Sequence, residues 1–134
     1  MGFEFEFDAK NNVLRGTIED RVTDAILLDF YATTGKYAAS HLPCRGIMDF
    51  SKVTKFDVSN EAIRAVAAAL PVFQPGNMRC LVCPADVIYG MARMFQILGE
   101  KTRSDLRVVR TLNEAYSLLG LESPEFSPIS SPEP

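Results

Sequence analysis

The sequence has few of the groups that enzymes use for catalysis. His41 is the only histidine among 134 residues, so a single imidazole is present to activate a serine or cysteine nucleophile. No glycine-rich loop of the kind that cradles phosphate groups occurs either. We therefore expect a protein without catalytic activity and without a bound cofactor.

A basic excess and long apolar runs are also missing. The last 13 residues hold three of the 17 acidic residues and no basic one, so residues 1–121 carry 14 acidic and 14 basic side chains. Surfaces that bind nucleic acid or anionic membranes normally need a basic excess, so neither partner is expected. No apolar run reaches the roughly 18 residues of a membrane span, and no leader-like segment opens the chain. These absences predict a cytoplasmic protein.

Cysteine is too scarce for a disulfide framework. The three cysteines are an odd number, which suits a reducing compartment. Cys80 and Cys83 form a C-x-x-C pair inside a predicted strand, where residues three apart point to opposite faces. We therefore interpret them as two buried hydrophobic residues. A redox pair, or a zinc site that also uses His41 and Cys44, is disfavoured by the same geometry, and no metal is expected.

The order of predicted elements indicates an α/β protein. Apolar residues alternate with polar ones over 3–8 and 13–18, as in a β-hairpin, and three further strands are predicted over 44–50, 78–83 and 106–110. Four helices are predicted between and after them, by apolar spacing and by start and stop residues: from Thr23 to Gly35, from Ser59 to Leu70, over 86–99 and over 111–120.

This order, β-β-α-β-α-β-α-β-α, predicts a mostly parallel five-stranded sheet with four main helices. The length suits one domain, which we assign to residues 1–121. Residues 122–134 contain three Ser-Pro pairs and little to bury, so we expect a disordered and dispensable tail.

Two segments carry a family resemblance. MDFSKVTKFDVS, residues 48–59, and PADVIYGMARMFQIL, residues 84–98, stand within an element order similar to that of STAS domains, found in anti-sigma-factor antagonists and sulfate-transporter tails. The chain resembles more closely the uncharacterised bacterial STAS/Sec14-like proteins, which share the SpoIIAA-like fold. The resemblance implies that fold and a non-catalytic regulatory module that contacts a protein partner through residues 55–66.

The resemblance also implies a switch loop, although a degenerate one. Antagonists usually show Asp, Ser, Ser or Thr, then Gly, and the hydroxyl directly after the Asp receives a phosphate. Here Asp57 matches, Val58 stands at the acceptor position, Ser59 supplies the second hydroxyl and Asn60 replaces the glycine. Ser59 also fits a helix N-cap, which explains it without a switch. A phosphate at a helix N-terminus is electrostatically favourable, so both hypotheses stay open.

The alternative function is a Sec14-like binder of a small apolar or anionic ligand or lipid. Methionine lines adaptable binding surfaces, so part of an apolar stripe on the third helix is a candidate pocket wall between that helix and the sheet. The candidate pocket residues are Met78, Tyr89, Met91, Met94 and Phe95. An enclosed apolar cavity would favour this ligand hypothesis, whereas a solid core would favour the contact module.

Arginines stand near the start of each of the four later strands: Arg15, Arg45, Arg79 and Arg107. They are either solvated strand ends facing acidic neighbours such as Glu6, or a basic ladder for an anionic ligand or self-association. The third and fourth strands are apolar on both sides, while successive crossovers tend to gather helices on one face. We therefore predict a homodimer that covers the second face.

Overall fold

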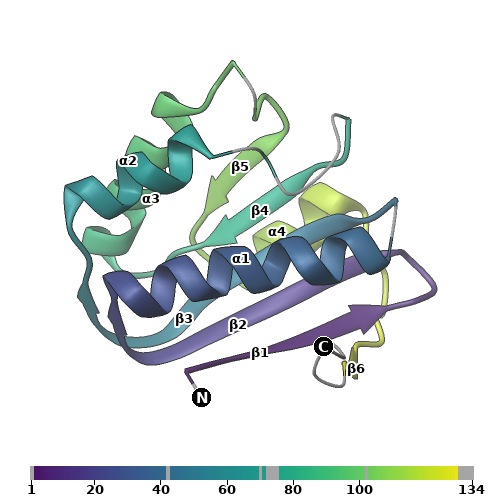
Figure 1. The fold of residues 1–134 in the computed structure, drawn as a ribbon. Helices are drawn as coiled ribbons and strands as arrows, with labels where there is room; N and C mark the ends of the chain where they lie inside the picture. Colours follow the sequence, from purple (N-terminus) through teal and green to yellow (C-terminus); the bar gives the residue numbers. More distant parts are fainter. Residues whose placement is uncertain (1, 42, 70, 72–75, 102, 130–134) are drawn as a thin grey trace.

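The computed structural model describes residues 2–41, 43–69, 71, 76–101 and 103–129 (Figure 1). Over this part of the chain the protein is an α/β structure with six strands and four helices, which confirms the predicted class. The elements are β1 (Phe3–Asp8), β2 (Val13–Thr23), α1 (Asp24–Ser40), β3 (Arg45–Asp57), α2 (Asn60–Ala68), β4 (Arg79–Val82), α3 (Asp86–Leu98), β5 (Leu106–Val109), α4 (Leu112–Leu119) and β6 (Ser127–Pro128).

The sheet is mixed, so the prediction of a mostly parallel five-stranded sheet is only partly right. Its order is β5-β4-β3-β2-β1-β6. Strands β2 to β5 are parallel neighbours, because each pair is joined by a helical crossover. Strand β1 is antiparallel to β2, as the short hairpin connection requires, and the sixth strand pairs antiparallel with β1.

Strands β2 and β3 are longer than predicted. They continue together as far as the pair Thr23 and Asp57, so the segment predicted as a turn before Ser59 is mostly strand. The register between them shifts twice, and Asp20 at one shift has a φ of 62°. These irregularities break the period of two, which explains why the apolar alternation ends early.

Two helices also differ from the predictions. Helix α1 continues through Gly35 to Ser40, because Tyr37 and Ala38 extend its buried stripe beyond that glycine. The apolar spacing over residues 86–99 predicts an inward-facing stripe that includes Val87 and Leu98, but these two residues of α3 are 68% and 50% exposed. The buried stripe of α3 is centred on Ile88 and Ala92 instead. None of the described helices combines the length and the apolar character that a bilayer span requires.

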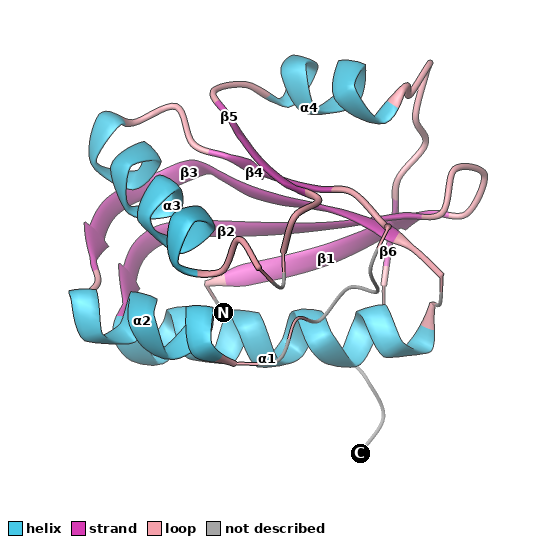
Figure 2. Cartoon of the chain, turned by 90° about the horizontal axis from the view of Figure 1, so that it is seen from above, coloured by secondary structure: helices cyan, strands magenta, loops and turns pink. Residues whose placement is uncertain are grey.

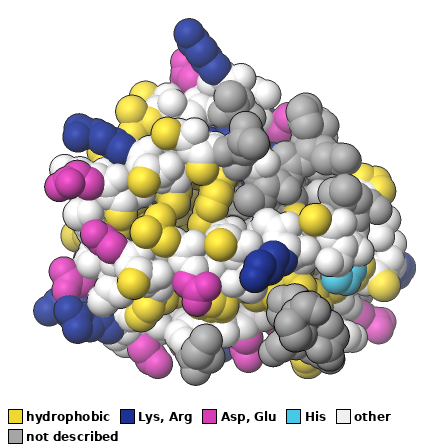
Figure 3. Space-filling model, in the orientation of Figure 1, with side chains coloured by type: hydrophobic (Ala, Val, Ile, Leu, Met, Phe, Trp, Pro, Cys, Tyr) yellow, Lys and Arg dark blue, Asp and Glu magenta, His cyan; other side chains and the backbone are white. Residues whose placement is uncertain are grey.

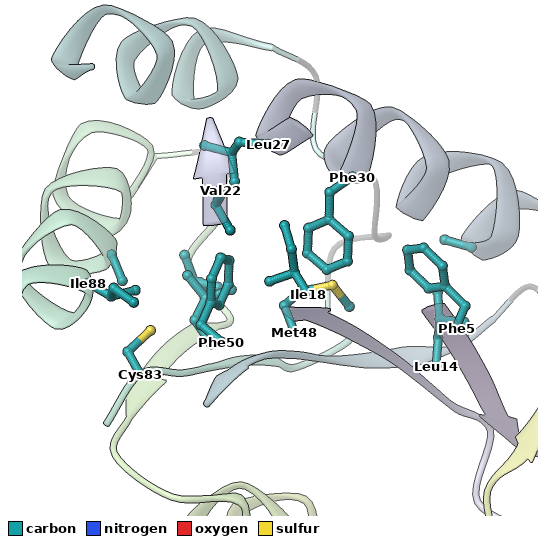
Figure 4. Packing of buried hydrophobic residues seen from close by; sticks show 14 of the residues in the cluster. Phe5, Leu14, Ile18, Val22, Leu27, Phe30, Met48, Phe50, Cys83 and Ile88 are labelled. Atoms are coloured by element: carbon teal, nitrogen blue, oxygen red, sulfur yellow. The ribbon is translucent and has the colours of Figure 1, made fainter. Parts of the chain in front are cut away.

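The sheet is covered on both faces. Helices α1, α2 and α3 lie on one face and α4 on the other (Figure 2). The main core fills the space under the three helices, where Phe5, Leu14, Ile18, Phe30 and Phe50 converge (Figure 4). A smaller core under α4 consists of Val13, Ile47, Cys80, Val82, Val109, Ala115 and Leu119. The second face is thus apolar as expected, but α4 of the same chain covers it. The homodimer was predicted to cover this face, so that argument for a dimer no longer applies.

Part of the segment expected to be a disordered tail contacts the domain. Ser127 pairs with Phe7, and the N–H of Ile129 donates to the carbonyl of Phe5 at 3.0 Å. The ring of Phe126 lies 4.0 Å from the guanidinium carbon of Arg15. Phe126 thus provides this Ser/Pro-rich segment with an aromatic side chain that packs against the domain. Residues 130–134 of the expected tail lie outside the described residues.

Candidate functional site

The predicted switch loop lies where β2 and β3 end side by side. Ser59 precedes α2 in extended conformation, and its Oγ accepts a hydrogen bond from the N–H of Ala62 at 3.1 Å. The N-cap interpretation of Ser59 is therefore confirmed. Asn60 is the exposed first residue of α2, and Val58 is half-buried against the main core.

The Ser59 hydroxyl is also engaged as a donor. Its Oγ donates to Oδ2 of Asp24 at 2.7 Å, and its N–H donates to Oδ1 of the same carboxylate at 2.7 Å. Asp24 is the first residue of α1, so one carboxylate joins the N-termini of two helices. A phosphate on Ser59 would abolish the donated hydrogen bond and place like charges together. This arrangement disfavours the phospho-switch hypothesis.

Asp57, the residue that matches the family pattern, pairs with an arginine. Oδ2 of Asp57 accepts a hydrogen bond from Nη2 of Arg21 at 2.6 Å. This hydrogen bond, together with the arginine's charge, lowers the pKa of the Asp57 carboxyl. Both side chains are exposed, so water screens the pair and it contributes little to stability. Asp57 thus joins the ends of two strands through its pairing with Arg21.

The cysteines lie where the strand geometry predicts. Cys80 belongs to the small core under α4 and Cys83 to the main core, so the two thiols are on opposite faces of the sheet. Burial raises the pKa of Cys80 to about 11 and that of Cys83 to about 12. Both thiols therefore stay protonated and unreactive near neutral pH. His41 lies apart from them, with its ring 4.4 Å from that of Phe7.

Three of the four ladder arginines are bound locally. Arg15 forms an ion pair with Glu6 at 2.5 Å, Arg45 donates to the carbonyl of Leu119, and Arg107 is exposed. Arg15 thus has the acidic neighbour that the strand-end hypothesis expects, but its side chain is only 19% exposed and is not a solvated strand end. Arg79 differs, because its side chain is only 5% exposed and turns towards the main core.

An apolar cavity of about 100 Å³ lies between the sheet and helices α1, α2 and α3. Figure 3 shows hydrophobic side chains gathered between α1 and α2 on this side of the molecule. The cavity follows β4 from Arg79 at its start to Cys83 beyond its end. Its apolar lining includes Leu27, Phe30, Met48, Phe50, Phe56, Ile63, Val66, Leu81, Ile88, Met91, Ala92, Phe95 and Leu106.

The structure places only some of the predicted pocket residues in the wall of the cavity. Met91 and Phe95 line the cavity. Tyr89 and Met94 pack against the main core without lining it, and the ring of Tyr89 lies 3.9 Å from the guanidinium carbon of Arg110. Met78 packs with the small core under α4. The helical stripe that faces the cavity is therefore narrower than the one read from the sequence.

Arg103 also lines the cavity and is 3% exposed. Its guanidinium donates to the carbonyls of Val66, Ala67 and Ala69 at 2.9–3.0 Å, where α2 ends. These carbonyls form the negative end of the helix dipole, so they stabilise the buried charge. Arg103 also donates to the hydroxyl of Tyr31 at 2.7 Å.

Arg79 lines the same cavity. Burial lowers the pKa of Arg79, the charge of Arg103 lowers it further, and Asp105 and Tyr31 act in the opposite direction. Two buried guanidinium groups thus stand together at one end of an otherwise apolar space. The sequence contained a signal for Arg79, because the period of two places it on the same face as Leu81. It contained none for Arg103, which lies in a loop.

Comparison with known proteins assigns no family. No family model matches the chain, and neither a curated protein nor a solved structure matches it. Mixed sheets with helices on both faces host many unrelated functions, so the fold alone does not select one. The chemistry of the cavity and of the switch loop is therefore the basis for assigning a role.

Proposed function

We propose that this protein is a non-catalytic, STAS-like module that holds a small, largely apolar molecule in the cavity beneath α1, α2 and α3. The cavity itself is the observation that carries the proposal, since three helices and the sheet line it with apolar side chains. A core cavity of roughly 150 Å³ holds benzene, while pockets for drug-sized ligands begin at roughly 300 Å³. A space of about 100 Å³ suits a ligand of a few heavy atoms rather than a whole lipid.

The lining supports binding without chemical conversion. Among the described lining residues the only thiol is that of Cys83, whose pKa burial raises to about 12, and no imidazole or carboxylate is included. General acid–base catalysis needs a group that titrates near the working pH. We also propose a reducing, cytoplasmic setting, which the buried free thiols of Cys44, Cys80 and Cys83 support.

A second candidate function is the protein-contact module that the STAS resemblance implies. The joined N-termini of α1 and α2 favour it, because the Asp24 carboxylate fixes the loop at Ser59 and presents the exposed side chains of Asn60 and Glu61. The sequential order of strands β2 to β5, each linked by a helix, agrees with the resemblance. In this role the loop would act as a fixed surface without phosphorylation.

Native mass spectrometry of protein purified from its host tests the first function. We expect one small adduct per chain that is lost on denaturation. Ala92 is buried in the cavity wall, so Ala92→Leu fills the space and removes the adduct. Ala65→Leu on the exposed side of α2 is the matched control and retains it. Bare protein in the wild type, or an adduct that survives Ala92→Leu in a folded variant, would contradict the proposal.

A further inference from the structure

We propose that the cavity selects a small aliphatic monocarboxylate, with its carboxylate at the end formed by Arg79 and Arg103 and its hydrocarbon part towards Phe50 and Ile88. This inference rests on the proposed binding function and adds the charge, the orientation and the chemical class of the ligand. It is carried by the cavity's shape and by the distribution of charge along it.

Positive charge is concentrated at one end of the cavity. Arg79 and Arg103 are 5% and 3% exposed, and both line the space. The described hydrogen-bond acceptors of Arg103 are three carbonyls and one phenol, all uncharged, so its net charge is not neutralised by them. Two like charges repel in a low-dielectric interior, and an anion beside both would relieve that repulsion.

Asp105, the acidic residue near Arg79, does not line the cavity, so it does not take the place of such an anion. Asp105 is half-buried in the segment before β5, and its Oδ2 accepts a hydrogen bond from the N–H of Gly76 at 2.9 Å. Its charge favours protonation of Arg79, yet Asp105 is not among the residues that line the cavity. The cavity surface therefore presents cations from the protein and no described carboxylate.

The opposite end of the cavity is apolar. Arg79 begins β4, whereas Cys83 follows its end, and Phe50, Phe56 and Ile88 line the space with that cysteine. In Figure 4 the side chains of Phe50, Cys83 and Ile88 converge between the sheet and α3. A ligand with one charged and one hydrocarbon end matches this polarity. The planar guanidinium fork suits a planar carboxylate, and the small volume favours it over a bulkier phosphate ester.

Calorimetric titration with two isosteric probes tests the charge selection. The probes are propanoate and its uncharged amide, added to the full chain once native mass spectrometry shows that the molecule retained from the host has been removed. We expect the carboxylate to bind at least tenfold more tightly. Arg79→Met should abolish this preference while the amide still binds. Arg107→Met, at an exposed arginine on β5, is the matched control and should leave the preference intact.

The outcomes separate the inference from the proposed function. Equal binding of both probes would overturn the charge selection and leave the binding function standing, whereas no binding of either would contradict both. Tighter binding of ethyl phosphate than of the carboxylate would overturn the assigned ligand class. If Arg79→Met does not fold, Arg79→Lys keeps the charge without the fork, and it should reduce the preference. An unchanged preference in that folded variant would contradict the role of the guanidinium.

Discussion

The hydroxyl and the backbone N–H of Ser59 each donate a hydrogen bond to the carboxylate of Asp24, and these two contacts join the N-termini of α1 and α2. The same hydroxyl accepts the capping hydrogen bond from Ala62. Both hydrogen-bonding roles of Ser59 are therefore used within the fold. The residue acts as a structural joint between two helices, and this is a different role from that of a phosphate acceptor.

We predict that Ser59→Ala lowers the free energy of unfolding by about 1–2 kcal/mol, because a cap and a charge-assisted hydrogen bond are lost. Ser59→Asp should lower it more, although aspartate is a good cap, because two carboxylates then face each other. Asp24→Asn should restore stability to the Ser59→Asp protein. Urea unfolding of the wild type, Ser59→Asp, Asp24→Asn and the double variant forms a double-mutant cycle. If Ser59→Asp is as stable as the wild type, the phospho-switch hypothesis regains support.

A second prediction concerns Gly16, which lies against two phenylalanine rings. A Cβ at this position would stand 2.6 Å from Cε1 of Phe5 and 3.0 Å from the ring of Phe30. Gly16→Ala should therefore cost about 1–3 kcal/mol through overpacking. Gly90 in α3 is the matched control, because a Cβ there meets nothing within 4 Å. Gly90→Ala should raise stability by about 0.5–1 kcal/mol. Thermal unfolding of both variants checks these opposite signs.

The third prediction concerns acid stability and Asp8, which is fully buried. Burial raises the pKa of Asp8, but hydrogen bonds from Asn11, Glu125 and Lys10 outweigh that effect, and the net pKa is lowered. A lowered pKa contributes stability above the unfolded value of about 3.9, and this stability is lost as the pH falls further. Urea unfolding between about pH 2 and 6 should show a flatter acid limb for Asp8→Asn than for the wild type.

The fourth prediction concerns the chain after α4. Deleting residues 122–134 removes β6 and the contact of Phe126 with Arg15, so we expect a lower melting temperature. Phe126→Ala should account for part of this loss. Deleting only residues 130–134 is the control, since it keeps every one of these contacts. An unchanged melting temperature after the long deletion would show that the segment is dispensable, as its Ser/Pro composition suggests.

The sequence predicted those features that depend on local patterns. The α/β order follows from apolar periods of two and 3.6, and the caps Thr23, Ser59 and Thr111 were readable because their hydroxyls bond only three residues away. The opposite faces of Cys80 and Cys83 also follow from strand geometry alone.

Features that depend on distant residues were missed or only partly seen. The extension of β3 to Asp57 is stabilised by pairing with β2, which polar residues do not signal. Arg103 is buried because α2 ends beside it, a contact between segments 34–37 residues apart in the chain. Coverage of the second face by α4 likewise depends on the direction of the chain after β5. No local pattern encodes any of these.

Methionine methyl groups give the most direct test of ligand binding in the cavity. Met48 and Met91 line it. Met94 packs against the main core without lining the cavity, Met78 packs with the small core under α4, and these two serve as internal controls. We would titrate ¹³C-methyl-methionine protein with propanoate and follow each methyl signal by NMR. Saturable shifts of Met48 and Met91, with Met78 and Met94 unchanged, are the expected result. No shift at Met48 and Met91 at millimolar probe, or shifts confined to Met78 and Met94, would contradict a ligand site beneath α1, α2 and α3.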